Sequence, residues 1–433
     1  MRWVVISLTL MTAMMAGCGQ NDDLLESGPI TDPVDPIDPG YTESLELTPA
    51  EKEIVNHSNE FAFNLFRQII DSRKDDESLK NQSIIISPIS ITYSLGMLNN
   101  GAAGNTQAQI NKVLGFGEAG ATGINDFCKK MLQAVPILDS LTKVMIANDI
   151  YVNKNYVLKQ DFTQTANTYY SAYPETRDFH DGQTLGVINK WASDHTEKMI
   201  KKILDENTFN PDAVSYLLNA IYFKGEWTIK FDKDLTQDEE FKHAGNTSEL
   251  IKRPMMHSNE YFEYAEIDGY QVLRLPYGNK SYQMTILLPI VEDNKLNALP
   301  AVPSAETWSK INKNMDSYLV DLKLPRIDTN TDIELPDIMS ALGMPDAFNA
   351  DKADFSNFCD TETCIGMMKQ VAAINLDEDG TEASAVTVIG VVNSAFTPDT
   401  PQIKYFHANH PFIYIISEIS SNAIFFVGQY TGY

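Results

Sequence analysis

The chain has 433 residues, 43% of them hydrophobic, and its 59 Asp and Glu outnumber its 33 Lys and Arg, for a net charge of −26. The hydrophobic fraction supports a sizeable core and excludes wholesale disorder. The negative charge argues against nucleic-acid binding, because a phosphate backbone would be repelled. Four cysteines in a chain of this length exclude a disulfide-built scaffold.

The first 17 residues read as an export signal. One Arg follows Met1, an apolar run extends from Trp3 to Met15, and small residues precede Cys18. The run is too short to span a bilayer but suits the apolar part of a signal peptide. Its end resembles a bacterial lipobox, in which the chain is cut before the cysteine and the thiol is lipidated. We expect a lipoprotein signal peptide over 1–17 and membrane attachment through acyl chains on Cys18. An ordinary secretory signal with a coincidental cysteine is the alternative.

Residues 18–47 predict a tether between that anchor and the folded part. The segment contains Asp32-Pro33, Asp35-Pro36 and Asp38-Pro39. Proline and like charges favour an extended, solvated chain without a core of its own. We expect a protein held in the bacterial cell envelope, facing the periplasm or the outer surface.

Residues 48–433 predict one α+β domain, because no proline-rich linker interrupts them. Apolar residues at helical spacing indicate a helix around Ile54–Ile70. A short β-branched run ends at Ile86, and Ser87-Pro88 then reads as an N-cap followed by proline at the first helical position. That helix is expected to end at Gly101, and Thr106 to cap the next one.

Strands dominate the second half of the prediction. Apolar and β-branched runs predict strands at Val144–Val152, Val214–Phe223, Tyr282–Leu288, Phe412–Ser417 and Ile424–Gln429.

Signals for an enzyme are weak. The sequence lacks the G-x-S-x-G, H-E-x-x-H and Walker motifs. Gly115–Gly120 matches G-x-G-x-x-G, but it follows a predicted helix and Glu118 would repel a pyrophosphate, so we interpret it as a helix stop. Among seven histidines only His407 and His410 are close in sequence, so we expect no metal site and no cofactor.

The cysteines of the domain offer no catalytic pattern. Cys359 and Cys364 form either a small disulfide loop or two free thiols, and Cys128 has no obvious partner. We expect no catalytic role for any of the three.

The segment 377–395 has the pattern of a chain that can become a strand. Gly380 offers a backbone hinge. Beyond it, alternate residues are small and uncharged and then β-branched: Thr381, Ala383, Ala385, Thr387, Ile389 and Val391. In an extended chain these share one face, which could enter a sheet. The run leads into a proline-containing stretch that reads as an exposed loop. An ordinary central strand is the alternative.

Four motifs occur in order along the chain. They are Ser87-Pro88-Ile89-Ser90 with Gly101–Thr106, the N-A-I-Y-F-K-G-E-W stretch from Asn219 to Trp227, the E-D-G-T-E-A-S-A stretch at 378–385, and F-H-A-N-H-P-F-I-Y-I-I at 406–416. Together they resemble the serpin family over about residues 48–433. The resemblance implies a single-domain serpin fold with a large central β-sheet, further sheets, a helix-rich N-terminal half and an exposed reactive-centre loop at about 378–405.

The resemblance also implies a mechanism. A serine or cysteine protease cuts the exposed loop, and the loop inserts into the main sheet while the protease is still covalently attached, which traps it. Small residues at the hinge favour an inhibitory serpin. A non-inhibitory serpin acting as a surface binding lipoprotein is the alternative. We expect a monomer that is not an enzyme.

Site residues follow from the matching motifs. The implied hinge comprises Glu378, Gly380, Thr381, Glu382, Ala383, Ser384 and Ala385. The implied shutter, where strands part, comprises Ser87, Ser90, Asn219 and Gln370, and the implied breach residue is Trp227. Gln370 stands where many serpins have a histidine; its amide can likewise donate and accept hydrogen bonds.

Counting along the implied loop places the cut between Ser394 and Ala395, with Val392-Asn393 and Phe396-Thr397 as alternatives. No Lys or Arg lies between Gly380 and Lys404. Trypsin-like enzymes, whose specificity pocket binds a cation, are therefore poor targets. We expect elastase-, chymotrypsin-, subtilisin- or papain-like targets.

Overall fold

The computed structural model describes residues 44–116, 120–245, 250–292, 295–381 and 402–433. The chain divides into two units, Met1–Pro39 and Gly40–Tyr433, and every described residue belongs to the second. No described helix combines the length and apolar character needed to cross a membrane.

The helices concentrate in the first half of the domain, as predicted. They are α1 (Pro49–Arg73), α2 (Pro88–Asn99), α3 (Gly104–Val113), α4 (Gly120–Ala134), α5 (Gln160–Tyr170), α6 (Thr184–Asp194), α7 (Ala305–Ile311) and α8 (Pro336–Leu342). A capping box fixes the start of α1, because the backbone N–H of Glu51 donates to the Thr48 hydroxyl (3.3 Å) and the Thr48 N–H donates to the Glu51 carboxylate (2.7 Å). The predicted apolar face of this helix is buried at Phe61, Leu65 and Phe66.

The strands build two sheets. They are β1 (Ile84–Ile86), β2 (Thr142–Asn153), β3 (Pro174–Arg177), β4 (Ser215–Glu226), β5 (Gln237–Phe241), β6 (Ile251–Ile267), β7 (Tyr270–Tyr277), β8 (Tyr282–Pro289), β9 (Asp316–Pro325), β10 (Ile327–Glu334), β11 (Lys369–Leu376), β12 (Gly380–Thr381), β13 (Ile403–His407), β14 (Phe412–Glu418) and β15 (Ile424–Tyr430). The six-stranded sheet has the order β10-β11-β12-β4-β2-β3. The nine-stranded sheet has the order β1-β15-β14-β8-β7-β6-β9-β13, with β5 beside β6.

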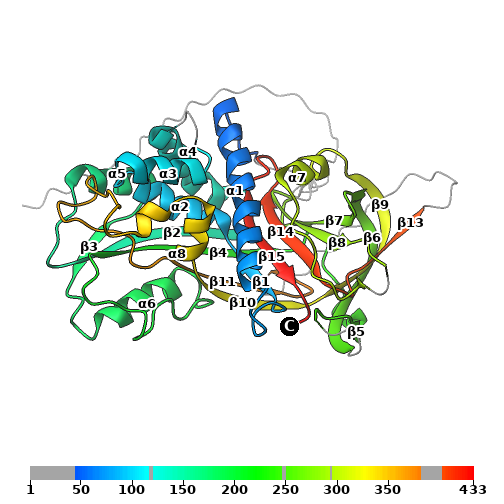
Figure 1. Ribbon diagram of the computed structural model, residues 1–433. Helices are drawn as coiled ribbons and strands as arrows, with labels where there is room; N and C mark the ends of the chain where they lie inside the picture. Colours follow the sequence, from blue (N-terminus) through cyan, green and yellow to red (C-terminus); the bar gives the residue numbers. More distant parts are fainter. Residues whose placement is uncertain (1–43, 117–119, 246–249, 293–294, 382–401) are drawn as a thin grey trace, which may run out of the picture. The chain divides into compact units, whose positions relative to one another are not determined.

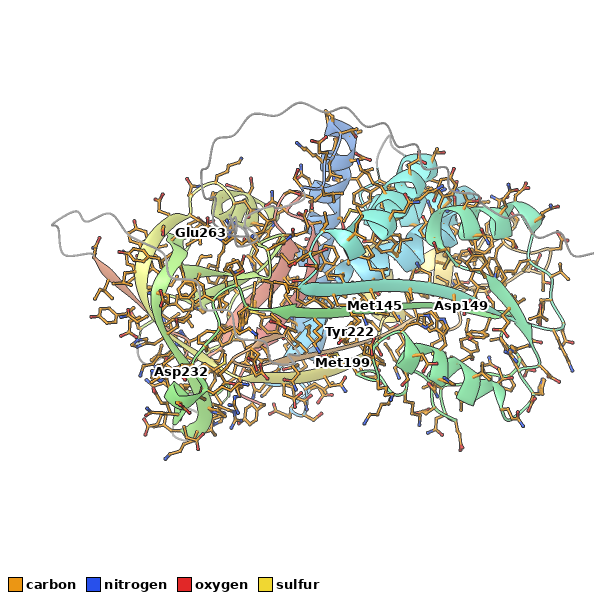
Figure 2. All side chains as sticks on the ribbon, turned by 180° about the vertical axis from the view of Figure 1, so that it is seen from behind. Met145, Asp149, Met199, Tyr222, Asp232 and Glu263 are labelled. Atoms are coloured by element: carbon orange, nitrogen blue, oxygen red, sulfur yellow. The ribbon has the colours of Figure 1, made fainter. Side chains whose placement is uncertain are left out.

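Helices cover both faces of the six-stranded sheet. In Figure 1, α2, α3, α4 and α5 lie on one side of β2 and β4, and α6 lies on the other. The α6 side has a small core of its own, in which Ile188 packs with Tyr151, Tyr216 and Leu218 of the sheet. Figure 2 shows the sheet from behind, with Met145 of β2 beside its partner Tyr222 of β4.

Two local predictions can be compared directly with the structure. Ser87 is the residue before α2, as predicted, but its hydroxyl donates to the Phe425 carbonyl (2.8 Å) rather than capping the helix. The prediction that Thr106 caps the next helix is wrong, since α3 already begins at Gly104. The Thr106 hydroxyl instead accepts the backbone N–H of Asp354 (3.0 Å), which joins α3 to a distant loop.

The glycine-rich segment after α3 is a helix stop, as predicted. Gly115 has a φ of +68°, which favours glycine after a helix end. A Cβ there would lie 2.8 Å from the Cβ of His57. Residues 117–119, which include Glu118, lie outside the described residues.

Candidate functional site

A two-residue strand lies between β4 and β11 at one end of the six-stranded sheet. In β12, Thr381 pairs with Leu376 of β11 on one side and with Gly225 of β4 on the other, both antiparallel. The end of the sheet that holds β12 is here called the top. The start of the predicted reactive loop is therefore already a strand of the sheet.

Gly380 occupies a position that only glycine can fill. Its φ is +147°, in a region that side chains with a Cβ rarely adopt. A Cβ would collide with the carbonyl oxygen of Gly225 and lie 2.8 Å from the Cα of Glu226. The glycine thus allows the chain to turn into the sheet against the backbone of β4.

Thr381 points into the core at the top of the sheet. It is buried, and its hydroxyl lies 2.7 Å from the hydroxyl of Tyr277. The Tyr277 ring stacks on Trp227, with ring centroids 4.4 Å apart. Burial raises the pKa of Tyr277, which outweighs the opposing effect of the Thr381 hydrogen bond. The phenol therefore stays neutral and keeps a proton to share with Thr381.

Trp227 holds the turn that leads into β12. Its indole N–H donates to the carbonyl of Asp377 (2.9 Å), and its backbone N–H donates to the carbonyl of Asp379 (2.9 Å). The side chain is buried. The tryptophan thus binds the backbone on both sides of Glu378, the first residue of the predicted hinge.

Cations hold two carboxylates just before Gly380: the hinge residue Glu378 and its neighbour Asp379. Glu378, only 1% exposed, accepts hydrogen bonds from Arg326 Nη2 (2.7 Å) and the Thr236 hydroxyl (2.5 Å). Burial acts to raise the pKa of Glu378, but the hydrogen bonds from Arg326 and Thr236 outweigh it and hold the pKa below its usual range. Asp379 forms an ion pair with Lys233 (2.5 Å). The hinge is therefore fixed by charge as well as by backbone pairing.

Below β12 the sheet is open. Within the described residues, β4 and β11 pair with β12 and with their outer neighbours but not with each other. A cavity of about 560 Å³ lies there, lined by Ser215–Ile221 of β4, Lys369–Val371 of β11 and several α2 side chains such as Leu95. We call this opening the slot.

The structure brings the four predicted shutter residues together around the slot. The Gln370 amide donates to the carbonyl of Ser87 (2.8 Å) and accepts the Ser87 N–H (3.2 Å). The Ser90 hydroxyl donates to the Asn219 amide oxygen. The start of α2 is therefore tied to β11 through Gln370 and to β4 through Asn219.

Three further residues of the site were missed by sequence reasoning. Asn148 of β2 accepts a hydrogen bond from the Asn219 amide (2.7 Å) and donates to the carbonyl of Tyr170 (2.8 Å). The other two missed residues are Arg326, which binds Glu378, and Tyr277, which contacts Thr381. Asn148 ties β4 to β2 and α5, so this pair of strands is joined as a unit on one side of the slot.

Several predicted residues lie outside the described residues. They are Cys18, the hinge residues Glu382, Ala383, Ser384 and Ala385, the expected cut between Ser394 and Ala395, and its alternatives Val392, Asn393, Phe396 and Thr397.

The cysteines and histidines add no catalytic arrangement to the part of the chain that the structure describes. Cys128, Cys359 and Cys364 are free thiols, and burial raises the pKa of Cys128 to about 12. A thiol with that pKa is a poor nucleophile. Across the described ranges, no three His, Cys, Asp or Glu side chains gather as metal ligands would.

Comparisons with known proteins agree with this geometry. The family model "Serpin (serine protease inhibitor)" matches residues 56–432. Serpin B3 of Homo sapiens is 32% identical over 396 residues, which cover 86% of this chain and 98% of that protein. The leukocyte elastase inhibitor of Equus caballus is 30% identical over 390 residues, covering 88% and 99%. The structure of the thermophilic serpin tengpin in its native state has a TM-score of 0.76 at 29% identity, covering 90% of this chain and 96% of that one. The chain therefore belongs to the serpin family and has the α+β serpin fold that its motifs predicted.

Proposed function

We propose that this protein inhibits serine or cysteine proteases by trapping them when its reactive loop is cut and inserts into the slot. Members of the serpin family are generally protease inhibitors rather than enzymes. The observation that carries the proposal is β12, a strand of two residues that stands at the head of an open slot. An inserting loop would extend this strand rather than create a new one.

The register of β12 supports the proposal. Continued along β4 in the same antiparallel register, position 383 meets Phe223, position 387 meets Asn219 and position 391 meets Ser215, where β4 begins. Along β11, position 383 meets Ile374 and position 387 meets Gln370. The small, uncharged face of the loop would therefore turn toward the buried side of both strands.

Insertion is favourable for two physical reasons. Positions 382–391 would form backbone hydrogen bonds to one or both neighbouring strands, each contributing about 0.5–1.5 kcal/mol net. The Ala, Thr, Ile and Val side chains would leave water for the core. The charged groups that stay outside, such as Glu382, would remain solvated.

The loop sequence favours proteases with apolar or small specificity pockets. The absence of Lys and Arg between Gly380 and Lys404 disfavours trypsin-like enzymes. One relative is named a leukocyte elastase inhibitor, which supports an elastase-like target here. Chymotrypsin-, subtilisin- and papain-like enzymes fit the same composition.

A protease panel tests the proposal. The protein is incubated with elastase-, chymotrypsin-, subtilisin-, papain- and trypsin-like enzymes, and complexes are sought by denaturing electrophoresis. We expect a detergent-resistant complex with at least one of the first four. Mass spectrometry of the released peptide then locates the cut. Complete loop cleavage by every enzyme without any complex would contradict inhibition and favour a non-inhibitory binding protein.

We also propose that the protein is a lipoprotein of the bacterial cell envelope, held by acyl chains on Cys18. The apolar run before Cys18 and the tether at 18–47 support this. Cys18→Ser should release the protein from the membrane fraction into the soluble fraction. Unchanged membrane association of this variant would contradict the lipid anchor.

A further inference from the structure

A coil segment crosses the lower end of the slot, which is the end farthest from β12. The segment begins on the β2 side, where Cys359 pairs with Leu158, and it leads into β11 at Lys369. Because β2 and β11 stand on opposite sides of the slot, the segment has to bridge them. We call residues 359–368 the crossing; in Figure 1 they belong to the orange coil at the left. Residues 361–368 of the crossing line the slot cavity.

The two cysteines of the crossing stand at its anchored start and in its cavity-lining part. Cys359 is buried, and its neighbours hold it to the β2 side: the Lys159 N–H donates to the carbonyl of Phe358 (2.8 Å), and the Lys159 ammonium pairs with Asp360 (3.0 Å). Cys364 is partly buried and lines the slot cavity. A bond between the two sulfurs would therefore join the anchored start of the crossing to the part that faces the slot.

The surroundings of the two thiols allow such a bond to form. The Cys359 thiol donates to the carbonyl of Thr361 (3.3 Å), so it points toward the chain that leads to Cys364. Thr361 and Glu362 are exposed, so the chain between the cysteines has room to fold outward as a small loop. Burial raises the pKa of Cys359, which slows its own attack on an oxidant. Cys364 is reached from the cavity and is the thiol that reacts first.

A disulfide would shorten the crossing. It holds two Cα atoms about 4.4–6.8 Å apart, whereas five residues of extended chain span up to about 17 Å. Cys364 would be drawn toward Cys359 on the β2 side. The four residues between Cys364 and Lys369 would then be pulled across the lower end of the slot.

The last positions of an inserted loop need that space. Continued along β11 in the register of β12, position 389 meets Met368 and position 391 meets Gly366. On the other side, position 391 meets Ser215, where β4 begins. The crossing is therefore the edge beside which the end of the inserted strand would lie. A crossing drawn toward β2 would obstruct positions 389–391 and leave the top of the slot unchanged.

We propose that Cys359 and Cys364 form a redox switch that closes the lower end of the slot when they are oxidised to a disulfide. The inference rests on the proposed trapping function, and it makes the reduced protein the stronger inhibitor. The oxidant is a disulfide, carried by a protein or by a small molecule such as oxidised glutathione. Disulfides form in the compartment to which the proposed export signal leads.

The switch reaction is thiol–disulfide exchange. The Cys364 thiolate attacks one sulfur of the oxidant, the S–S bond of the oxidant breaks, and one thiol leaves. The Cys359 thiolate then attacks the Cys364 sulfur of the mixed disulfide and releases the second thiol. Two protein thiols are oxidised to one disulfide, the oxidant is reduced to two thiols, and the two protons pass to the released thiols.

Comparison of oxidised and reduced protein tests the switch. The protein is treated with oxidised glutathione or with dithiothreitol, the reagent is removed, and peptide mapping without reduction should find Cys359 linked to Cys364 after oxidation. With a serine protease that the reduced protein traps, oxidation should raise the stoichiometry of inhibition about twofold or more, because stalled insertion lets hydrolysis compete. Reduction should restore it. Cys364→Ser should keep the reduced value under both treatments. Cys128→Ser is the matched control, since Cys128 is buried in α4, and it should respond as wild type does.

The melting temperature provides a readout that does not need a trapped protease. After the loop is nicked, the rise in melting temperature should be smaller for oxidised than for reduced protein, because fewer loop positions enter the sheet. The inference is overturned if both thiols remain open to alkylation after oxidation, or if the oxidant links two chains instead. Linked cysteines with an unchanged stoichiometry and an unchanged rise would overturn it as well. A smaller rise in the oxidised protein, without a complex with any protease, would support the switch and contradict the proposed inhibition.

Discussion

At the scale of single residues, Glu378 is unusual because it is charged and almost fully buried. Its neighbours compensate for the lost hydration: Arg326 and Thr236 donate hydrogen bonds, and Arg326 stays half-exposed. The pKa of Arg326 is raised by the hydrogen bond to Glu378. Because Glu378 stands two residues before Gly380, the same contacts fix the point at which the chain enters the sheet.

Glu378→Gln should destabilise the native protein. The amide keeps the shape of the carboxylate but loses the charge-assisted bonds, so we expect the free energy of unfolding at pH 7 to fall by about 1–3 kcal/mol. The folded pKa of Glu378 lies below its unfolded value. Its stabilisation is therefore present above about pH 4.3 and is lost as pH falls through the folded pKa. The gap between the urea midpoints of wild type and variant should therefore be full at pH 7 and narrow as the pH is lowered towards and through the folded pKa of Glu378.

The matched control for this carboxylate is Glu260→Gln. Glu260 is an exposed residue of β6, and the substitution should leave the urea midpoint unchanged at every pH. A Glu378→Gln midpoint equal to that of wild type at pH 7 would show that the buried pair adds nothing to stability.

At the scale of elements, the hydrophobic pattern of the sequence predicted the strands that are continuously apolar. It missed strands in which buried and exposed residues alternate. The five predicted strands correspond to β2, β4, β8, β14 and β15, and the structure extends most of them by one to three residues. β10 reads Ile-Asp-Thr-Asn-Thr-Asp-Ile-Glu and alternates strictly between buried and exposed positions. Its inward residues include two threonines, so its apolar signal was weak, although the period of two was present.

Local sequence patterns also could not reveal the missed site residues, because these residues contact partners that are distant in the sequence. Gly380, Ser90 and Asn219 belong to motifs that can be read locally. Tyr277 meets Thr381 across 104 residues of sequence, and Asn148 meets Asn219 across 71. Such contacts arise only when distant strands pair, and no local pattern encodes them.

If the protein traps proteases as proposed, Ala383→Arg should convert it into a substrate. Position 383 would lie between Phe223 and Ile374, both buried, where a guanidinium has no partner and costs several kcal/mol. Insertion would stall and the protease would complete hydrolysis. The stoichiometry of inhibition should therefore rise at least about tenfold, since each 1.4 kcal/mol is a factor of ten in partitioning.

Glu382→Arg is the control for this loop variant. In an inserted loop, alternation would place the side chain at position 382 on the outer face of the new strand, so the same charge should be tolerated. Equal inhibition by both variants would contradict insertion in the register of β12.

At the scale of the whole molecule, the two sheets differ in completeness. The nine-stranded sheet pairs without interruption through its central strands β15, β14, β8, β7 and β6. The six-stranded sheet is continuous on either side of the slot, and among the described residues only Gly380 and Thr381 of β12 bridge the two sides. The polar contacts of Asn219 and Gln370 hold the two halves to α2. Within the described part of the chain, the facing edges of β4 and β11 below β12 therefore have no strand partner.

Cutting the loop should raise the melting temperature of the protein. If positions 382–391 fill the slot, about ten new backbone hydrogen bonds contribute about 10 kcal/mol. For a domain of about 390 residues, the entropy of unfolding near 60 °C is about 0.8 kcal/mol per kelvin, so the melting temperature should rise by about 10 °C or more. Differential scanning calorimetry at one fixed scan rate compares intact protein with protein nicked by a non-target protease. Nicked Ala383→Arg should show no such rise, because its loop stays outside. An equal melting temperature before and after nicking of the wild type would mean that the slot does not receive the loop, and the trapping mechanism would then be untenable.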